Sequence, residues 1–164
     1  FFAEARSLGI EPIILNDLIR DVSLVKAWDA LLSIRKLLAK ERPDFLHINS
    51  SMAGAIGSCA AWLYRFDPLN KTIRVIYTVH GFVFNEPLPA FKKKIYQLIE
   101  KTSASWKGAL ICVSNYDKGQ GIKYKIAPEK RMVVIHNGID ASQQFLTRAE
   151  ARAKLGIPDA VFAV

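Results

Sequence analysis

Histidine, serine and asparagine side chains follow the apolar segments of this chain, at the places where those segments end. The stretch YTVHGFVFNEP (77–87) is the clearest case, because a β-rich run from Arg74 to Val79 ends in His80 and Gly81. A turn needs the glycine, but it does not need an imidazole, which can donate, accept or bind a proton near neutral pH. His80 is therefore a candidate for contact with a ligand. The alternative is a histidine whose hydrogen bonds are satisfied inside the core.

Polar residues follow three other apolar segments in the same way. They are His47 with Ser50 and Ser51, Ser114 with Asn115, and His136 with Asn137 and Gly138. Ligands of parallel sheets bind beyond the carboxyl ends of the strands, so the three histidines of the chain predict a polar cleft along one sheet edge. A simpler interpretation is that Ser50, Ser51 and Ser114 cap helices and that Asn-Gly forms a turn.

The start of the helix after Ser50 and Ser51 has a second interpretation. Gly54 follows within one turn, and a Ser-Ser-x-x-Gly turn at a helix N-terminus can hold a phosphate group.

Strand-like and helix-like segments alternate along the chain. Strands are expected at 11–15, 44–48, 72–80, 109–113, 131–136 and 160–164, and helices at 1–8, 23–41, 52–65, 90–106, from Ser114 onwards, and at 147–156. The alternation indicates βα units and a mainly parallel sheet, and nearly all-apolar strands indicate that both sheet faces are covered. The expected fold is therefore α/β, with a Rossmann-like, mainly parallel sheet and helices on both faces.

Two of the expected helices have amphipathic patterns. The helix at 23–41 is expected to bury Val25, Trp28, Leu31, Leu32 and Leu38, and the helix at 90–106 to bury Phe91, Ile95, Leu98, Ile99 and Trp106. The second helix also carries the run Lys92 to Lys94. With Phe91 and Ile95, these lysines form a basic, partly apolar surface that predicts weak peripheral binding to anionic membranes.

The composition limits the class of protein. With 164 residues, 51% of them hydrophobic and 23% charged, the chain can form one globular domain with a core. No apolar run approaches the roughly 20 residues of a membrane-spanning helix, and no signal peptide is expected. The net charge of +8 attracts anionic partners or simply solvates the surface. Nucleic acid is not an expected partner, because no nucleic-acid-reading motif accompanies the charge.

Several classes of catalytic and metal site are not indicated. Cys59 and Cys112 have neither metal-ligand nor Cys-x-x-Cys spacing, so they are expected to be buried free thiols in a reducing compartment, and no metal site is expected. No Gly-x-Gly-x-x-Gly turn, Walker loop or Gly-x-Ser-x-Gly elbow is present. Both ends look cut, since the chain opens inside a helical pattern and closes on an apolar strand pattern, so we interpret it as a piece of a longer protein.

Four motifs in order resemble one enzyme family. They are RPDFLHINSSMAGAIGSCAA, IYTVHGFVFNE, ALICVSNYDK and VVIHNGID. This set, in which TVHGF and VIHNGID are the most specific parts, resembles the N-terminal domain of family 4 glycosyltransferases of the GT-B fold, over nearly the whole chain. Such enzymes have two Rossmann-like domains facing across a cleft. The resemblance implies that residues 1–140 form the N-terminal domain without its first strand. Residues 141–164 then form a linker and the start of the C-terminal donor domain.

The resemblance also implies a reaction. The N-terminal domain of such an enzyme holds a glycan or lipid-linked acceptor, and the C-terminal domain binds a nucleotide-sugar donor. The sugar is transferred with retention of configuration, usually without a metal. No cofactor is expected in this chain, which is expected to be inactive without the missing donor domain. The expected location is the cytoplasm, with peripheral contact to the cytoplasmic face of the membrane.

The roles of single residues are carried over from the matching motifs. His80 matches the histidine that faces the donor sugar and the acceptor, and it is the candidate catalytic residue. The residues expected on the acceptor side are Ser50, Ser51, Gly54, Gly81 and Phe82, and those expected at the cleft or its hinge are Ser114, Asn137 and Gly138.

The sequence departs from the family pattern at three positions. Asn49 and Met52 replace a second histidine and a lysine, which removes a cation from the place where an acceptor phosphate would bind, and His136 replaces a common proline. Two alternatives remain open, namely a non-catalytic accessory module with a Rossmann-like fold and one half of a sugar-nucleotide epimerase.

Overall fold

The computed structural model describes residues 2–18, 24–66, 72–140, 142, 144–158 and 160–162. Four parallel strands form one sheet in the order β1 (Phe45–Ile48), β2 (Arg74–Val79), β3 (Ala109–Cys112) and β4 (Met132–Val134). The helices are α1 (Phe2–Ser7), α2 (Leu24–Glu41), α3 (Ser51–Tyr64), α4 (Ala90–Ala104), α5 (Asn115–Lys123) and α6 (Arg148–Leu155), with 3₁₀ turns η1 (Val83–Asn85) and η2 (Glu129–Arg131). The predicted α/β class with a parallel sheet is confirmed.

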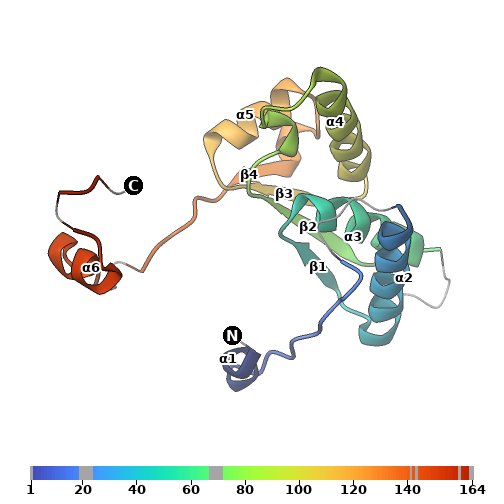
Figure 1. Cartoon of the computed structure of the whole chain (residues 1–164). Helices are drawn as coiled ribbons and strands as arrows, with labels where there is room; N and C mark the ends of the chain where they lie inside the picture. The colour runs from blue at the N-terminus through green and yellow to red at the C-terminus, as the bar shows by residue number, and fades with distance from the viewer. Residues whose placement is uncertain are drawn as a thin grey trace.

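The helices of the three crossovers lie on one side of the sheet. Each strand pairs with the next one in the sequence, and right-handed crossovers then place α3, α4 and α5 on the same face, as Figure 1 shows. On that face Val75, Tyr77 and Val79 of β2 are fully buried. On the other face Ile76 and Ile111 are only half-buried, so the cover expected on the second face is not provided by these three helices.

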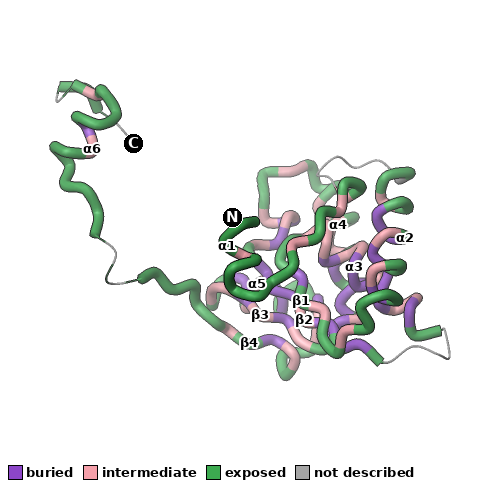
Figure 2. Tube along the Cα trace, turned by 90° about the horizontal axis from the view of Figure 1, so that it is seen from below, coloured by how far each residue is buried: buried purple, intermediate pink, exposed green. Residues whose placement is uncertain are grey.

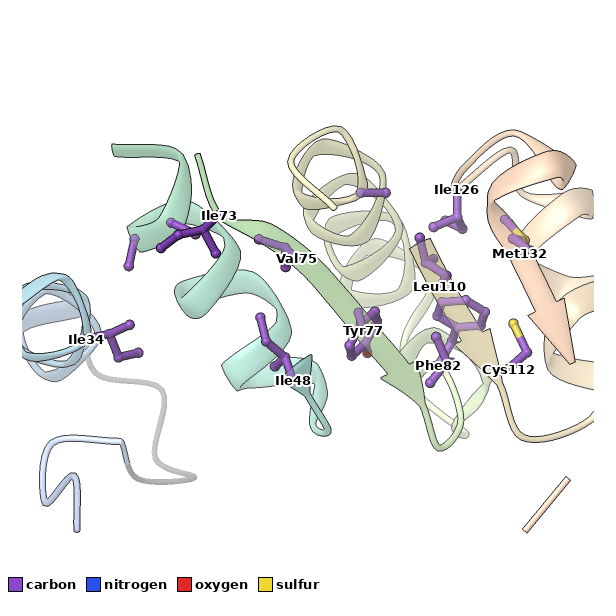
Figure 3. Packing of buried hydrophobic residues seen from close by; sticks show 14 of the residues in the cluster. Ile34, Ile48, Ile73, Val75, Tyr77, Phe82, Leu110, Cys112, Ile126 and Met132 are labelled. Carbon is purple, nitrogen blue, oxygen red and sulfur yellow. The ribbon is translucent and has the colours of Figure 1, made fainter. Parts of the chain in front are cut away.

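The core lies between the sheet and the helices packed on it, and it extends through α3 to α2. Ile34 of α2, Ile48 of β1 and Leu110 of β3 belong to one cluster of buried side chains that also includes Tyr77 (Figure 3). Figure 2 shows where the buried residues lie along the chain. They gather in the sheet and its helices, while α1 and α6 are largely exposed. Residues 135–140 and 144–147 have no regular structure and lead from the sheet to α6 (Figure 1).

The buried face of α2 differs from the predicted one. Leu31 and Leu38 are buried as expected, together with Ala30 and Ile34. Val25, Trp28 and Leu32 were expected inside, but they are 70%, 60% and 36% exposed. The prediction was wrong for these three residues because α2 packs on α3 through a narrow stripe of its surface. The apolar residues of α2 cover a wider part of the helix than this stripe, so some of them stay exposed.

Helix α4 has the reverse of the expected orientation. Phe91, Ile95, Leu98 and Ile99 were expected inside but are 61%, 50%, 65% and 41% exposed, and Trp106 is half-buried. Glu100, Ser103 and Ala104 are the buried residues of this helix. The prediction was wrong because a buried polar cluster, described below, takes the inner face of α4.

Two expected strands are not found among the described residues. Residues 11–15 have no strand structure, and Ile13 and Ile14 are exposed. Residues 160–162 form a turn and a bend, while 163–164 lie outside the described residues. An apolar run of this length becomes a strand only beside a pairing partner, and neither run has one within the described sheet.

The two cysteines differ in burial. Both are free thiols; Cys112 is buried and Cys59 is half-buried, so the predicted buried thiol is confirmed for Cys112 only. Burial raises the pKa of the Cys112 thiol to about 11 and raises that of Cys59 as well. Both are therefore protonated near neutral pH.

Candidate functional site

The residues of the predicted polar cleft lie along the carboxyl edge of the sheet. Because all four strands are parallel, their carboxyl ends meet at one edge, where the loop after each strand begins. These loops carry most of the residues that the sequence suggested for the site. The exceptions are His47, which lies in β1, Ser51 and Gly54, which lie in the first turn of α3, and Asn115, which is the first residue of α5.

The end of β1 is polar. His47 is exposed, and its Nε2 atom shares a hydrogen bond of 2.7 Å with Thr78 Oγ1 of β2. Ser50 is the N-cap of α3, since its hydroxyl oxygen accepts a hydrogen bond from the backbone N–H of Ala53 at 3.2 Å. The predicted capping role is thus confirmed for Ser50. Ser51 is the first residue of α3 and is half-buried.

His80 stands directly after β2. Its side chain is exposed, so the alternative of a core histidine is wrong. Gly81 has a φ of +114°, a backbone conformation that favours glycine, and a methyl group built on its α-carbon would meet no atom within 4 Å. The space above Gly81 is therefore open, and a ligand can approach the main chain beside His80.

Phe82 points the other way. Its ring is 2% exposed and stacks on Phe84 with the ring centroids 4.8 Å apart. In this conformation the side chain supports the loop from below and offers no surface to an acceptor.

The ends of β3 and β4 are tied together. Ser114 caps α5, accepting from the Asp117 backbone N–H at 3.1 Å and donating to Asp117 Oδ2 at 2.6 Å. His136 Nδ1 lies 3.1 Å from the carbonyl oxygen of Val113. A carbonyl can only accept, so Nδ1 carries the proton. Asn137 and Gly138 follow as exposed residues without regular structure.

Gly54 has a structural reason for being glycine. A β-carbon at this position would lie 2.9 Å from Tyr77 Cε2 and 3.2 Å from Tyr77 Cζ, so the first turn of α3 rests directly on the Tyr77 ring. The sequence suggested Gly54 for the acceptor side. The structure shows a packing role instead, since the absence of a side chain at Gly54 lets the first turn of α3 lie against the Tyr77 ring.

We expect Gly54→Ala to destabilise the fold by about 1–3 kcal/mol, because overpacking displaces the Tyr77 ring and outweighs the roughly 1 kcal/mol that alanine contributes inside a helix. Gly119→Ala is the matched control. Gly119 lies in α5 with no atom within 4 Å of an added β-carbon, so this variant should gain up to about 1 kcal/mol. Chemical unfolding of both variants beside the unaltered protein measures the difference. A Gly54→Ala variant as stable as Gly119→Ala would contradict the prediction.

A buried polar cluster beneath the edge was not predicted. Tyr77 Oη lies 3.3 Å from Glu100 Oε1 and 3.4 Å from Ser51 Oγ. Glu100 Oε2 lies 3.5 Å from Lys107 Nζ, which donates to Ser103 Oγ at 2.9 Å. Glu100, Ser103 and Lys107 recur at intervals of three and four residues, which is the spacing of one helical face. That polar stripe was the available sequence signal.

Burial dominates the ionisation of this cluster. It raises the pKa of Glu100 and lowers the pKa of Lys107, while each partner acts in the opposite sense on the other. Burial likewise raises the pKa of Tyr77 well above its usual range. Among the described residues, no three His, Cys, Asp or Glu side chains lie close enough to hold a metal ion.

A parallel α/β sheet with polar residues at its carboxyl edge is shared by proteins of many unrelated functions. The family model described as "Glycosyltransferase Family 4" matches residues 4–143. The chain belongs to this family and forms a glycosyltransferase family 4 domain.

Named relatives agree with the family. The chain is 37% identical over 132 residues to the UDP-Gal:alpha-D-GlcNAc-diphosphoundecaprenol alpha-1,3-galactosyltransferase of Escherichia coli, covering 80% of this chain and 33% of that protein. It is 30% identical over 126 residues to the capsular polysaccharide biosynthesis glycosyltransferase CapM of Staphylococcus aureus, covering 77% and 31%. The chain thus spans about a third of the length of the curated relatives it matches.

One solved structure supports the fold. A glycosyltransferase from Rickettsia africae matches with a TM-score of 0.59 and 21% identity, over 97% of this chain and 39% of that one. At this identity the likeness concerns the fold alone. No helix in the described part of the chain is long and apolar enough to cross a membrane.

Proposed function

We propose that this chain is the acceptor-side domain of a retaining glycosyltransferase that moves a sugar from a nucleotide-sugar to a glycan or lipid-linked acceptor. The observation that carries the proposal is the exposed His80 at the carboxyl end of β2, beside the open space above Gly81, in a family 4 domain. His80 would act by hydrogen bonding to the transferred sugar or the acceptor hydroxyl, and by positioning the two groups.

We assign acceptor binding and donor binding to two different domains, because the chain spans only about a third of the length of its relatives. Residues 1–140 would form the acceptor domain, and 141–164 would lead into a donor domain that binds the nucleotide-sugar. Asn137 and Gly138, exposed and without regular structure, would serve as the hinge, and Ser114 would line the cleft beside them. The 164-residue chain alone would then transfer no sugar.

The full-length protein should be tested first with the substrates named for the Escherichia coli relative, UDP-galactose and a short-lipid analogue of N-acetyl-α-D-glucosaminyl diphosphate, and then with a panel of other donors. Transfer by the full-length protein, but not by the 164-residue chain, supports the proposal. Transfer by the isolated chain at an enzyme-like rate contradicts the proposed division. Absence of transfer with every donor favours a non-catalytic module.

We also propose that α4 contacts anionic lipid at the cytoplasmic face of the membrane. The outer face of α4 carries exposed Phe91, Ile95 and Leu98. On a helical projection Lys92 lies on one flank of this apolar stripe, with Lys94 and Lys101 on the other, and all three lysines are exposed. An apolar stripe between two cationic flanks suits an anionic bilayer surface better than a neutral protein partner. A pocket of about 440 Å³ adjoins Lys101, and Lys125 and Arg131 also line it.

Lys92→Ala combined with Lys94→Ala should weaken binding to phosphatidylglycerol vesicles about thirtyfold, since each lysine near an anionic surface contributes about 1 kcal/mol. Lys36→Ala on α2 removes an exposed lysine elsewhere and should have little effect. Vesicle co-sedimentation of the full-length protein, repeated at high salt, measures both. Equal binding to phosphatidylcholine and phosphatidylglycerol would exclude this surface as an anionic-lipid site, and self-association through α4 would assign the stripe to a second copy.

A further inference from the structure

The buried cluster beneath the acceptor-side turn links Ser51 to an ion pair. Tyr77 lies on β2 three residues before His80, and its ring stands between two neighbours. On one side the first turn of α3 packs on the ring at Gly54. On the other side Lys107 Nζ lies 4.0 Å from the ring centroid, a cation–π contact. The Tyr77 hydroxyl is therefore held in place beside Ser51.

The hydrogen bonds of Tyr77 have one consistent direction. Its hydroxyl has a single proton but two neighbours, Glu100 Oε1 at 3.3 Å and Ser51 Oγ at 3.4 Å. Lys107 Nζ, 3.5 Å from Glu100 Oε2, favours the ionised form of Glu100 against the effect of burial, and the carboxylate of such an ion pair only accepts. Tyr77 therefore donates to Glu100, and the Ser51 hydroxyl donates to Tyr77 Oη.

This direction decides what Ser51 can offer to a ligand. A hydroxyl has one proton and two lone pairs. The proton of Ser51 is then directed inward to Tyr77, which leaves the lone pairs of its oxygen as the groups that can meet a ligand. Such an oxygen accepts from a sugar hydroxyl but cannot donate to a phosphate oxygen.

We propose that Tyr77, held by Glu100 and Lys107, is a positioning residue that fixes Ser51 as a hydrogen-bond acceptor for a hydroxyl group of the sugar acceptor. The inference deepens the proposed function and rests on it, because it needs Ser51 to meet the acceptor. A buried ion pair contributes little net stability compared with apolar residues of similar volume. Packing alone therefore does not require Glu100 and Lys107 beneath the turn.

The test is a double-variant cycle in the full-length protein. Tyr77→Phe keeps the ring and removes the hydroxyl, and Ser51→Ala removes the proposed contact. Binding of the short-lipid N-acetyl-α-D-glucosaminyl diphosphate analogue is measured by calorimetry without donor, and the KM values of acceptor and donor are measured separately. Each single variant should weaken analogue binding about fivefold, the effect of one hydrogen bond. The double variant should be no weaker than Ser51→Ala, and the donor KM should not change.

A merely structural role for Tyr77 gives a different pattern. The losses would then multiply in the double variant, and donor and acceptor parameters would change together. That result, unchanged affinity in Tyr77→Phe, or no binding of the analogue to the unaltered protein would overturn the inference. If the full-length protein transfers sugar but its acceptor affinity does not depend on Tyr77, the proposed function stands and the inference about Tyr77 is wrong. If the variants change analogue binding in the expected pattern but no sugar is transferred, the inference about Tyr77 stands and the proposed function is wrong.

Discussion

If the proposed function holds, His80→Ala in the full-length protein should reduce the rate of sugar transfer by a factor on the order of 10²–10³, the usual effect of removing a group that stabilises charge in the transition state. The fold should be nearly unaffected, because His80 is exposed and lies after the last residue of β2. The measurement is kcat/KM for transfer, with hydrogen exchange of the β2 peptides as the report on folding.

His136→Ala is the matched control for His80→Ala. His136 is also exposed and also follows a strand, but its ring is bound to the Val113 carbonyl. We expect its loss to reduce transfer far less. Equal losses in the two variants would mean that His80 has no special place at this edge. A parallel loss of transfer and of β2 protection in His80→Ala would make it a structural residue.

The edge of the sheet was predictable because it depends on local signals. β1, β2, β3 and β4 are apolar runs bounded by turn residues, and parallel pairing brings their ends together whatever the details of packing. The capping roles of Ser50 and Ser114 followed from the same local rules. His80, which follows β2, lies at this edge for the same reason.

The inner face of α4 was not predictable from hydrophobicity. The rule that apolar residues face inward placed Leu98 and Ile99 in the core, whereas Glu100 is the residue that points there. Its partner Lys107 lies beyond the end of the helix. The spacing of Glu100, Ser103 and Lys107 indicates one helical face, but only the folded chain shows that this polar face is the buried one. The clash that forbids a side chain at Gly54 depends in the same way on Tyr77, a residue 23 positions away that the strand pattern marked only as apolar.

Lys107→Met should destabilise the domain by about 3–5 kcal/mol, because it leaves the buried Glu100 carboxylate without its cation. The double variant Glu100→Leu with Lys107→Met removes both charges and should recover most of that loss, since a buried ion pair replaced by apolar residues is often neutral to stability. Hydrogen exchange of β2 and α4 in the full-length protein reports on this domain separately from the rest. A double variant as unstable as Lys107→Met would mean that packing, and not the stranded charge, causes the loss.

The pH dependence separates these explanations further. In the unaltered protein burial raises the pKa of Glu100 and Lys107 counteracts that rise, so Lys107→Met should raise the pKa of Glu100 in the folded state further. A group whose folded pKa is raised contributes stability below its unfolded pKa and loses it as the pH rises through the folded pKa. The stability difference between Lys107→Met and the unaltered protein should therefore be small near the ordinary pKa of glutamate and grow towards neutral pH. The double variant has no carboxyl group at this position, so its stability difference from the unaltered protein should not grow towards neutral pH. If the stability difference of Lys107→Met also stayed constant with pH, the effect of Lys107 would come from its packing on Tyr77.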